Sequence, residues 1–149
     1  MFNISLGNQV LALSVLSWAL AQLTKGIVQR IVDGTFSLEQ FLASGGMPSS
    51  HSALVTCCAV TTGVLYGFDS GLFALACLFA LVVMYDACHV RKSSGEQAAA
   101  FNQLLPWLQE LQPNMSQQEL KVFMGHTGLQ VFFGALLGLA VGLIGMWWL

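Results

Sequence analysis

The sequence has very little charge for its length. Only 8% of its 149 residues are charged and 56% are hydrophobic, whereas a soluble domain carries about 25% charged residues. Between Asp33 and Asp86 the only other charged residues are Glu39 and Asp69. The net charge of −2 argues against nucleic acid as a partner, because binding to a phosphate backbone requires a clear excess of basic residues. Most of this chain is therefore expected to be surrounded by lipid, with membrane lipids as its partners.

Metal-ligand and signal-peptide patterns are also missing. The cysteines lie in or at the ends of apolar runs, and none has zinc-ligand spacing: Cys57, Cys58, Cys77 and Cys88. They are interpreted as small apolar residues that pack between helices. We expect no metal site and no other cofactor. Because the N-terminus lacks a positive region and a small-residue cleavage site, the first apolar run is expected to be retained.

Four segments are long and apolar enough, or nearly so, to cross a membrane, which takes about 20 residues. They cover residues 6–28, 52–68, 72–88 and 127–149. The predicted fold is therefore all-α. It is a single transmembrane domain over residues 1–149, a polytopic bundle of four transmembrane helices with short interfacial helices on the cytoplasmic side.

The basic residues predict the orientation of this bundle. With four spans, all five fall on one side: Lys25, Arg30, Arg91, Lys92 and Lys121. Under the positive-inside rule this side is cytoplasmic, which predicts an integral protein of the bacterial inner membrane or an equivalent membrane. Capping-box patterns at Ser37–Gln40, Ser93–Glu96 and Ser116–Glu119 predict a short helix each on the same side.

The last span carries glycine at every fourth position: Gly134, Gly138 and Gly142. This double GxxxG pattern is typical of helices that pack closely together. The packing is expected either within one protomer or across a homodimer.

Each of the three histidines lies at the cytoplasmic end of a span. His51 and His126 begin the second and fourth spans, and His89 ends the third. Helix N-termini bind oxyanions, and an imidazole near Lys25 and Arg91 is held neutral, available as a nucleophile. A second histidine can protonate the leaving oxygen, which favours metal-free phosphoryl chemistry. The alternative is that these residues only anchor helix ends, for instance with Asp86 pairing with Arg91 or Lys25.

Several short motifs resemble a known family. They are Gly45–Ala53, Tyr85–Ala87 with Val90 and Arg91, Gly95–Ala98 with Asn102, and Gly125–Thr127 with Val131 and Gly134. Together they look like the divergent branch of the type 2 phosphatidic acid phosphatase superfamily, which is related to acid phosphatases and vanadium haloperoxidases. The resemblance extends from Lys25 to about Gly138.

The resemblance implies roles for particular residues. Superfamily enzymes remove phosphate through a phosphohistidine without a metal, which makes His126 the nucleophile and His51 the general acid. Phosphate binding is expected from Lys25, Gly46, Ser49, Ser50, Arg91 and Lys121. Asp86 and His89 are expected to support this site, Asp86 by orienting Arg91 or His89. The implied substrate is a lipid phosphate or a related small phosphoester.

The sequence also departs from the superfamily pattern. The carboxylate partner of the nucleophile is replaced by Gln130, which shares a helix face with His126. A neutral amide does not stabilise an imidazolium as a carboxylate does, and losing that role costs orders of magnitude in rate. The chain also has four predicted spans where six are common. The second hypothesis is therefore a non-catalytic membrane protein that keeps the fold and an anion or lipid-headgroup pocket.

Overall fold

The computed structural model describes residues 6–34, 46–112, 120, 122 and 125–148. Within these residues every element is helical: α1 (Leu6–Asp33), α3 (Ser50–Tyr66), α4 (Gly71–Tyr85), the π-helical turn η1 (Asp86–Val90), α5 (Arg91–Leu111) and α6 (Gly128–Trp148). The all-α prediction is therefore confirmed. The short helices predicted to begin at residues 37 and 116 lie outside the described residues.

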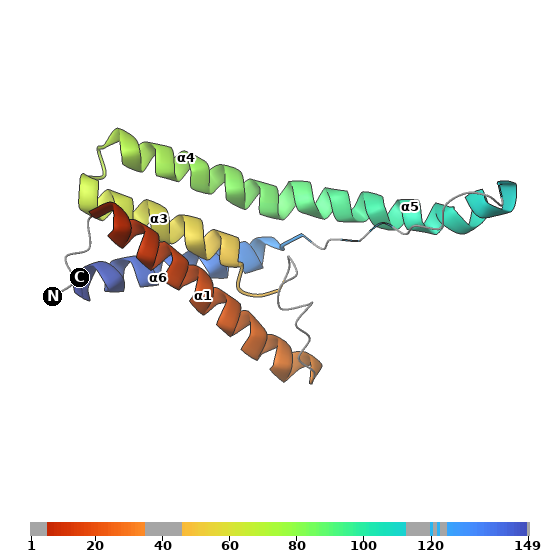
Figure 1. Ribbon diagram of the computed structural model, residues 1–149, viewed down its shortest axis with the longest axis horizontal. Helices are drawn as coiled ribbons and strands as arrows, with labels where there is room; N and C mark the ends of the chain where they lie inside the picture. The colour runs from red at the N-terminus through yellow and green to blue at the C-terminus, as the bar shows by residue number, and fades with distance from the viewer. Residues whose placement is uncertain (1–5, 35–45, 113–119, 121, 123–124, 149) are drawn as a thin grey trace.

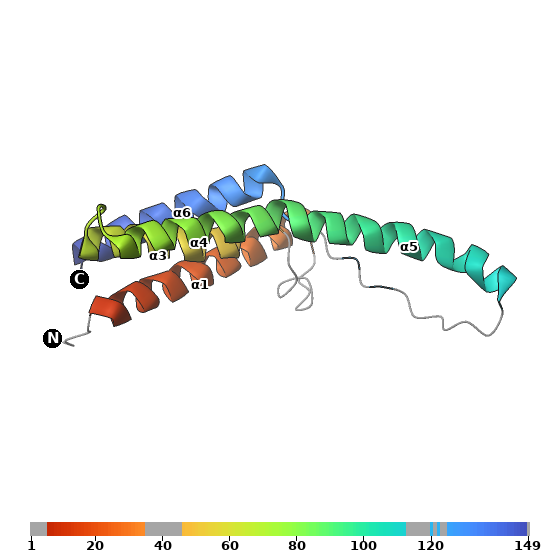
Figure 2. The same cartoon turned by 90° about the horizontal axis from the view of Figure 1, so that it is seen from above.

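Helix α3 is the centre of the bundle. It packs against α1, α4 and α6, and Figures 1 and 2 show these three helices grouped around it. α3 and α6 run parallel, while α1 and α4 run in the opposite direction. The N-termini of α3 and α6 therefore share one end of the bundle with the C-terminal ends of α1 and α4.

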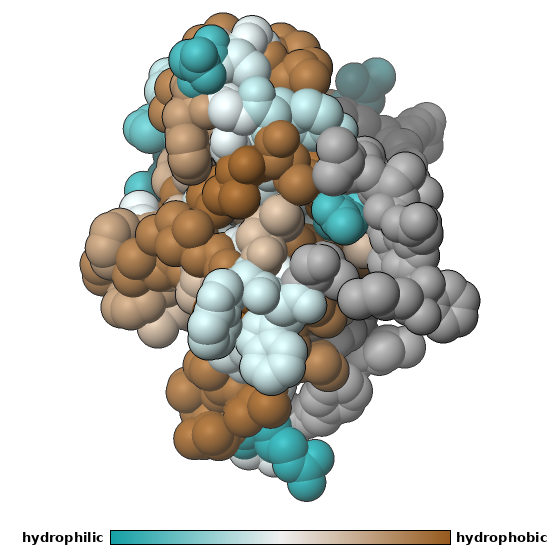
Figure 3. Space-filling view, turned by 90° about the vertical axis from the view of Figure 1, so that its left-hand side faces the viewer, coloured by the Kyte–Doolittle hydropathy of each residue, from teal (hydrophilic) through white to brown (hydrophobic). Residues whose placement is uncertain are grey.

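Among the residues that the structure describes, three helices are long and apolar enough to cross a membrane: Gln9–Val32, Gly71–Leu108 and Gly128–Trp148. They correspond to the first, third and fourth predicted spans. α3 covers the second but has only 17 residues. Where Figure 3 looks onto the end of the bundle that carries the C-terminus, apolar residues cover much of the described surface and hydrophilic ones are few. Large apolar side chains are also exposed along the helices, such as Leu23 of α1, Leu78 of α4 and Leu143 of α6, which suits a hydrocarbon environment.

A tight turn brings α4 back alongside α3. Gly67 ends α3 with a φ of 93°, a backbone conformation that glycine adopts readily. The Ser70 hydroxyl donates to the Gly67 carbonyl at 2.7 Å and accepts the Phe73 N–H at 3.2 Å, which caps α4. α4 consequently runs back toward the end of the bundle at which α3 begins.

The helix predicted to start at Ser93 is not separate, and this prediction was wrong. α4 passes through η1 directly into α5, which continues beyond the bundle (Figure 1). A capping box supplies hydrogen-bond partners to the N–H groups at the start of a helix. No helix starts at Ser93, because the backbone is already helical at Val90, before α5 begins. Pro106 also lies inside α5 and does not end it.

The glycines of α6 lie against α3 in the same chain. Gly134, Gly138 and Gly142 are all buried. A Cβ added at Gly134 would collide with the Ser49 carbonyl oxygen, and one at Gly138 with the Ala53 carbonyl oxygen. The absence of side chains thus lets two backbones approach. The predicted homodimer through these glycines stays a prediction, and it would have to displace α3 from them.

We expect Gly138→Ala to destabilise the bundle. Its methyl group meets the α3 backbone, so the helices must separate, at a cost of about 1–3 kcal/mol. The apparent melting temperature in detergent, measured by far-UV circular dichroism, should fall. Gly71→Ala is the matched control because nothing lies within 4 Å of its added Cβ; equal melting temperatures for the two variants would contradict the close packing.

Candidate functional site

The two histidines at the starts of α3 and α6 lie close together. His51 is the second residue of α3, and His126 lies just before α6. Their ring centroids are 6.1 Å apart, with 63° between the ring planes. In-line action on one phosphoryl group requires both imidazoles within about 10 Å, since catalytic groups must reach the reacting atoms. The structure meets this condition.

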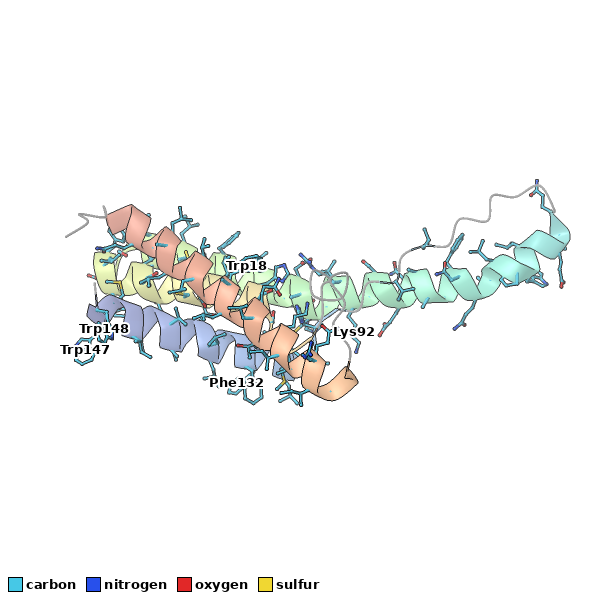
Figure 4. All side chains as sticks on the ribbon, turned by 60° about the horizontal axis from the view of Figure 1, so that its bottom comes forward. Trp18, Lys92, Phe132, Trp147 and Trp148 are labelled. Carbon is cyan, nitrogen blue, oxygen red and sulfur yellow. The ribbon has the colours of Figure 1, made fainter. Side chains whose placement is uncertain are left out.

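Polar and basic residues gather at this same end of the bundle. Figure 4 shows Lys92 where α5 leaves the bundle, and Trp147 and Trp148 at the opposite end. Lys25 and Arg30 lie in the C-terminal part of α1. The predicted clustering on one face is therefore seen for all basic residues except Lys121, which lies outside the described residues.

Gln130 fixes which nitrogen of His126 carries a proton. The Gln130 Oε1 atom accepts the Thr127 backbone N–H at 3.1 Å and lies 3.2 Å from His126 Nδ1. A backbone N–H can only donate, so the Gln130 side-chain atom that faces Thr127 and His126 is the amide oxygen and not the amide nitrogen. Because this oxygen can only accept, His126 Nδ1 must carry a hydrogen. His126 Nε2 then holds the lone pair. It is buried and has no hydrogen-bond partner among the described residues.

Thr127 and Gln130 form a capping box that the sequence interpretation missed. The Gln130 N–H donates to Thr127 Oγ1 at 3.4 Å, reciprocating the bond to Gln130 Oε1. The signal was present, because Thr-x-x-Gln is a capping-box pattern. A glutamine at position 130 therefore has a structural role at the start of α6, besides orienting His126.

The π-helical turn holds the His126 backbone. In η1 the Arg91 N–H donates to the Asp86 carbonyl, five residues earlier. In an α-helix it would donate to the Ala87 carbonyl, four residues earlier. The Ala87 carbonyl instead accepts the His126 N–H at 2.9 Å. Gly125 makes this approach possible, since a Cβ there would lie 2.8 Å from Lys92 Cα. No sequence signal for this turn was recognised.

The same turn pairs Asp86 with Arg91. Residues five apart are stacked by i→i+5 bonding, and Arg91 Nε donates to Asp86 Oδ2 at 2.8 Å. Their side chains are 40% and 39% exposed, so solvent screens the pair and it contributes at most about 1 kcal/mol. Of the two groups that Asp86 was expected to orient, Arg91 is the one it contacts. His89 instead stacks on Tyr85, with centroids 4.5 Å apart.

Lys25 and the segment before α3 are packed together. The Lys25 side chain is buried and lies against Gly46, where an added Cβ would be 2.9 Å from Lys25 Cε. Gly46 also has a φ of +85°. Its observed role is therefore to leave room for Lys25.

Ser49 connects α3 to α6. Its hydroxyl oxygen accepts from Ser52 N–H at 3.4 Å and from the Ser52 hydroxyl at 3.0 Å, and its N–H donates to the Gln130 carbonyl at 3.0 Å. Neither hydroxyl bond uses the hydrogen of the Ser49 hydroxyl, and Ser49 is fully buried. Ser50 is also buried.

The two imidazoles lie among charged groups, and the His126 ring is biased toward the neutral form. His51 lies close to the charged groups of Arg91, Asp86 and Lys25. Burial lowers the pKa of His126, against a raising effect of the Gln130 hydrogen bond. The His126 ring is therefore neutral at pH 7. Among the described residues no cluster of three His, Cys, Asp or Glu suited to a metal ion is present.

Two hollows adjoin the site, one beside each histidine. His51 lines an apolar groove of about 470 Å³ together with Asp86 and Arg91. His126 lines a more polar cavity, also about 470 Å³, with Lys92 and Glu96. The sequence interpretation did not identify the apolar residues of the groove, because nothing in the sequence marks which faces of three helices meet.

The fold and the site together define a class of protein: a polytopic helical membrane protein with a cluster of histidine and basic residues at one end of the bundle. Residues 6–141 match the family described as "Divergent PAP2 family", and the chain belongs to that family. The resemblance inferred from the motifs is thereby confirmed. The chain is 38% identical over 151 residues to a Bacillus subtilis (strain 168) protein described as "Uncharacterized membrane protein YuiD", covering 93% of this chain and 94% of that one. No solved structure matches the chain.

We expect Gln130→Glu to raise the pKa of His126. The carboxylate can accept the same two N–H groups and adds a negative charge, which raises the pKa of a neighbouring imidazole by about 1–3 units. Nitrogen-15 NMR of the imidazoles should show His126 titrating below its ordinary 6.5 in the parent protein and at higher pH in the variant. The parent spectrum should also show hydrogen on Nδ1 at pH 7. An unshifted midpoint in the variant would disprove the contact.

We expect Gly125→Ala to detach His126 from the π-helical turn. The added methyl meets the Lys92 backbone and pushes the segment away from the Ala87 carbonyl. Losing a buried backbone bond costs about 1–3 kcal/mol, so the His126 amide should exchange hydrogen roughly 10 to 100 times faster. Gly71→Ala serves as control, and unchanged exchange in Gly125→Ala would show that this bond is not formed.

Proposed function

We propose that the protein is a metal-independent membrane phosphatase acting on a lipid phosphate or a related phosphoester. One observation carries the proposal. Two imidazoles at neighbouring helix N-termini lie 6.1 Å apart, and Nε2 of His126 is buried without a partner. Family membership supports phosphatase-like chemistry.

The reaction takes two balanced steps. The lone pair of His126 Nε2 attacks phosphorus opposite the leaving oxygen, the P–O bond breaks, and His51 gives its proton to that oxygen. Water then attacks the phosphohistidine while neutral His51 takes its proton, and the P–N bonding pair returns to His126. The products are the free alcohol and inorganic phosphate.

Lys25, Arg91 and the two helix N-termini would hold the phosphate. A phosphate dianion bound between the rings favours the protonated form of the neighbouring His51 imidazole. The substrate itself would therefore bring His51 into the form that a general acid needs.

We also infer that α3 makes a fourth crossing. Its 17 residues rise about 26 Å, close to the thickness of the hydrocarbon core. It connects the polar end of the bundle to the end where α6 finishes (Figure 1). All four helices would then cross together, with the basic end facing the cytoplasm under the positive-inside rule.

A second function is favoured by Gln130. Its amide orients His126 and caps α6 but carries no charge to stabilise an imidazolium. A protein with this arrangement can bind a phosphate headgroup without turning it over. The alternative is therefore a non-catalytic protein with the same anion pocket.

The test is phosphate release from a panel of lipid phosphates and diphosphates by purified protein in bilayer discs with EDTA present. We expect turnover by the parent and loss of at least about 100-fold in kcat for His126→Ala. Trp147→Phe, at the opposite end of the bundle (Figure 4), should retain activity.

Vanadate binding separates the two functions. Turnover by His126→Ala at the parent rate would refute the assignment of His126 as the nucleophile. Vanadate binding by the parent, weakened in His51→Ala, without turnover on any substrate would establish the non-catalytic alternative instead.

A further inference from the structure

The apolar groove beside His51 opens between α1 and α4. Both helices pack on α3, yet within the described residues they have hardly any contact with each other. The groove walls are apolar side chains from all three helices: Trp18, Leu54, Val55, Phe79, Val82 and Val83. Its open side faces the layer where the surrounding lipid chains would lie.

The groove ends at the polar groups of the site. His51, Asp86 and Arg91 line the same hollow as the apolar walls. Arg91 uses its Nε for Asp86, and a guanidinium has four further N–H donors. One continuous hollow therefore combines apolar walls with groups that bind an anion.

A second apolar hollow extends this path along α4. It has a volume of about 510 Å³ and lies between the same three helices, with Ala76 and Leu72 in its wall. Phe79 lines both hollows, so they adjoin, and the second is lined by residues nearer the start of α4. From Asp86 to Leu72 the path follows 14 residues of helix, or about 21 Å. This length suits one extended hydrocarbon chain.

The two histidines face different surroundings. His51 lines the apolar groove, whereas His126 lines the polar cavity with Lys92 and Glu96. In an in-line displacement the nucleophile and the leaving oxygen lie on opposite sides of phosphorus. If His126 attacks and His51 protonates, the leaving alcohol is on the groove side.

We propose that the groove holds the single hydrocarbon chain of the leaving alcohol, and that phosphate and water use the polar cavity on the other side of His126. This inference rests on the proposed function and narrows its substrate to a phosphate ester of a long-chain alcohol. Because the chain comes from an equally apolar bilayer, its burial gains little free energy. Recognition in the groove is therefore steric.

The experiment uses vanadate as the anion probe and alkyl phosphonates, which are not hydrolysed, as competitors in bilayer discs. It measures the mole fraction of octyl or hexadecyl phosphonate that displaces half of the bound vanadate. Val83→Trp fills the groove and should raise this value at least tenfold for both competitors. Ala76→Trp fills only the farther hollow and should raise it for hexadecyl phosphonate alone. Leu143→Trp, exposed on α6, should change neither.

Vanadate affinity in each variant reports whether the anion site is intact. Should Val83→Trp lose it, Leu54→Phe is the smaller replacement that fills the same groove. Equal displacement in Val83→Trp and Leu143→Trp, with vanadate affinity unchanged, would overturn the groove assignment and leave the anion site standing. Failure of the parent to bind vanadate would instead refute the proposed function.

Discussion

The close approach of α3 and α6 is the constraint on which the rest of the structure depends. Gly134 and Gly138 present no side chain to the carbonyl oxygens of Ser49 and Ala53, so the two parallel helices lie backbone to backbone. Their N-termini consequently meet at one end. That meeting sets the His51 and His126 rings 6.1 Å apart and places the positive ends of two helix dipoles at the same end of the bundle.

The π-helical turn attaches the remaining elements to this pair. Its irregular hydrogen bonding leaves the Ala87 carbonyl free to accept the His126 N–H and stacks Asp86 beneath Arg91. A bulge of this kind is often found at functional sites. Here it connects α4 both to the residue before α6 and to the cation that faces the groove.

Gln130 serves the fold and the site through one oxygen atom. Capping α6 and orienting His126 both require an acceptor at this position, and an amide meets both needs. A carboxylate would meet them as well and add charge. The difference between glutamine and glutamate therefore affects the electrostatics of the imidazolium while leaving the geometry in place.

The sequence by itself determined the lipid environment, the all-helical class, the family and the clustering of His51, His126 and the cations. These follow from local patterns: apolar run lengths, the spacing of basic residues and short motifs. Only the tertiary structure decided that the α6 glycines pack on α3, that α4 continues into α5, and that a groove lies between α1 and α4. It also decided that Ala87, through its carbonyl, holds His126. These features depend on contacts between residues far apart in the chain, and a pattern read along one segment carries no information about the segment that packs against it.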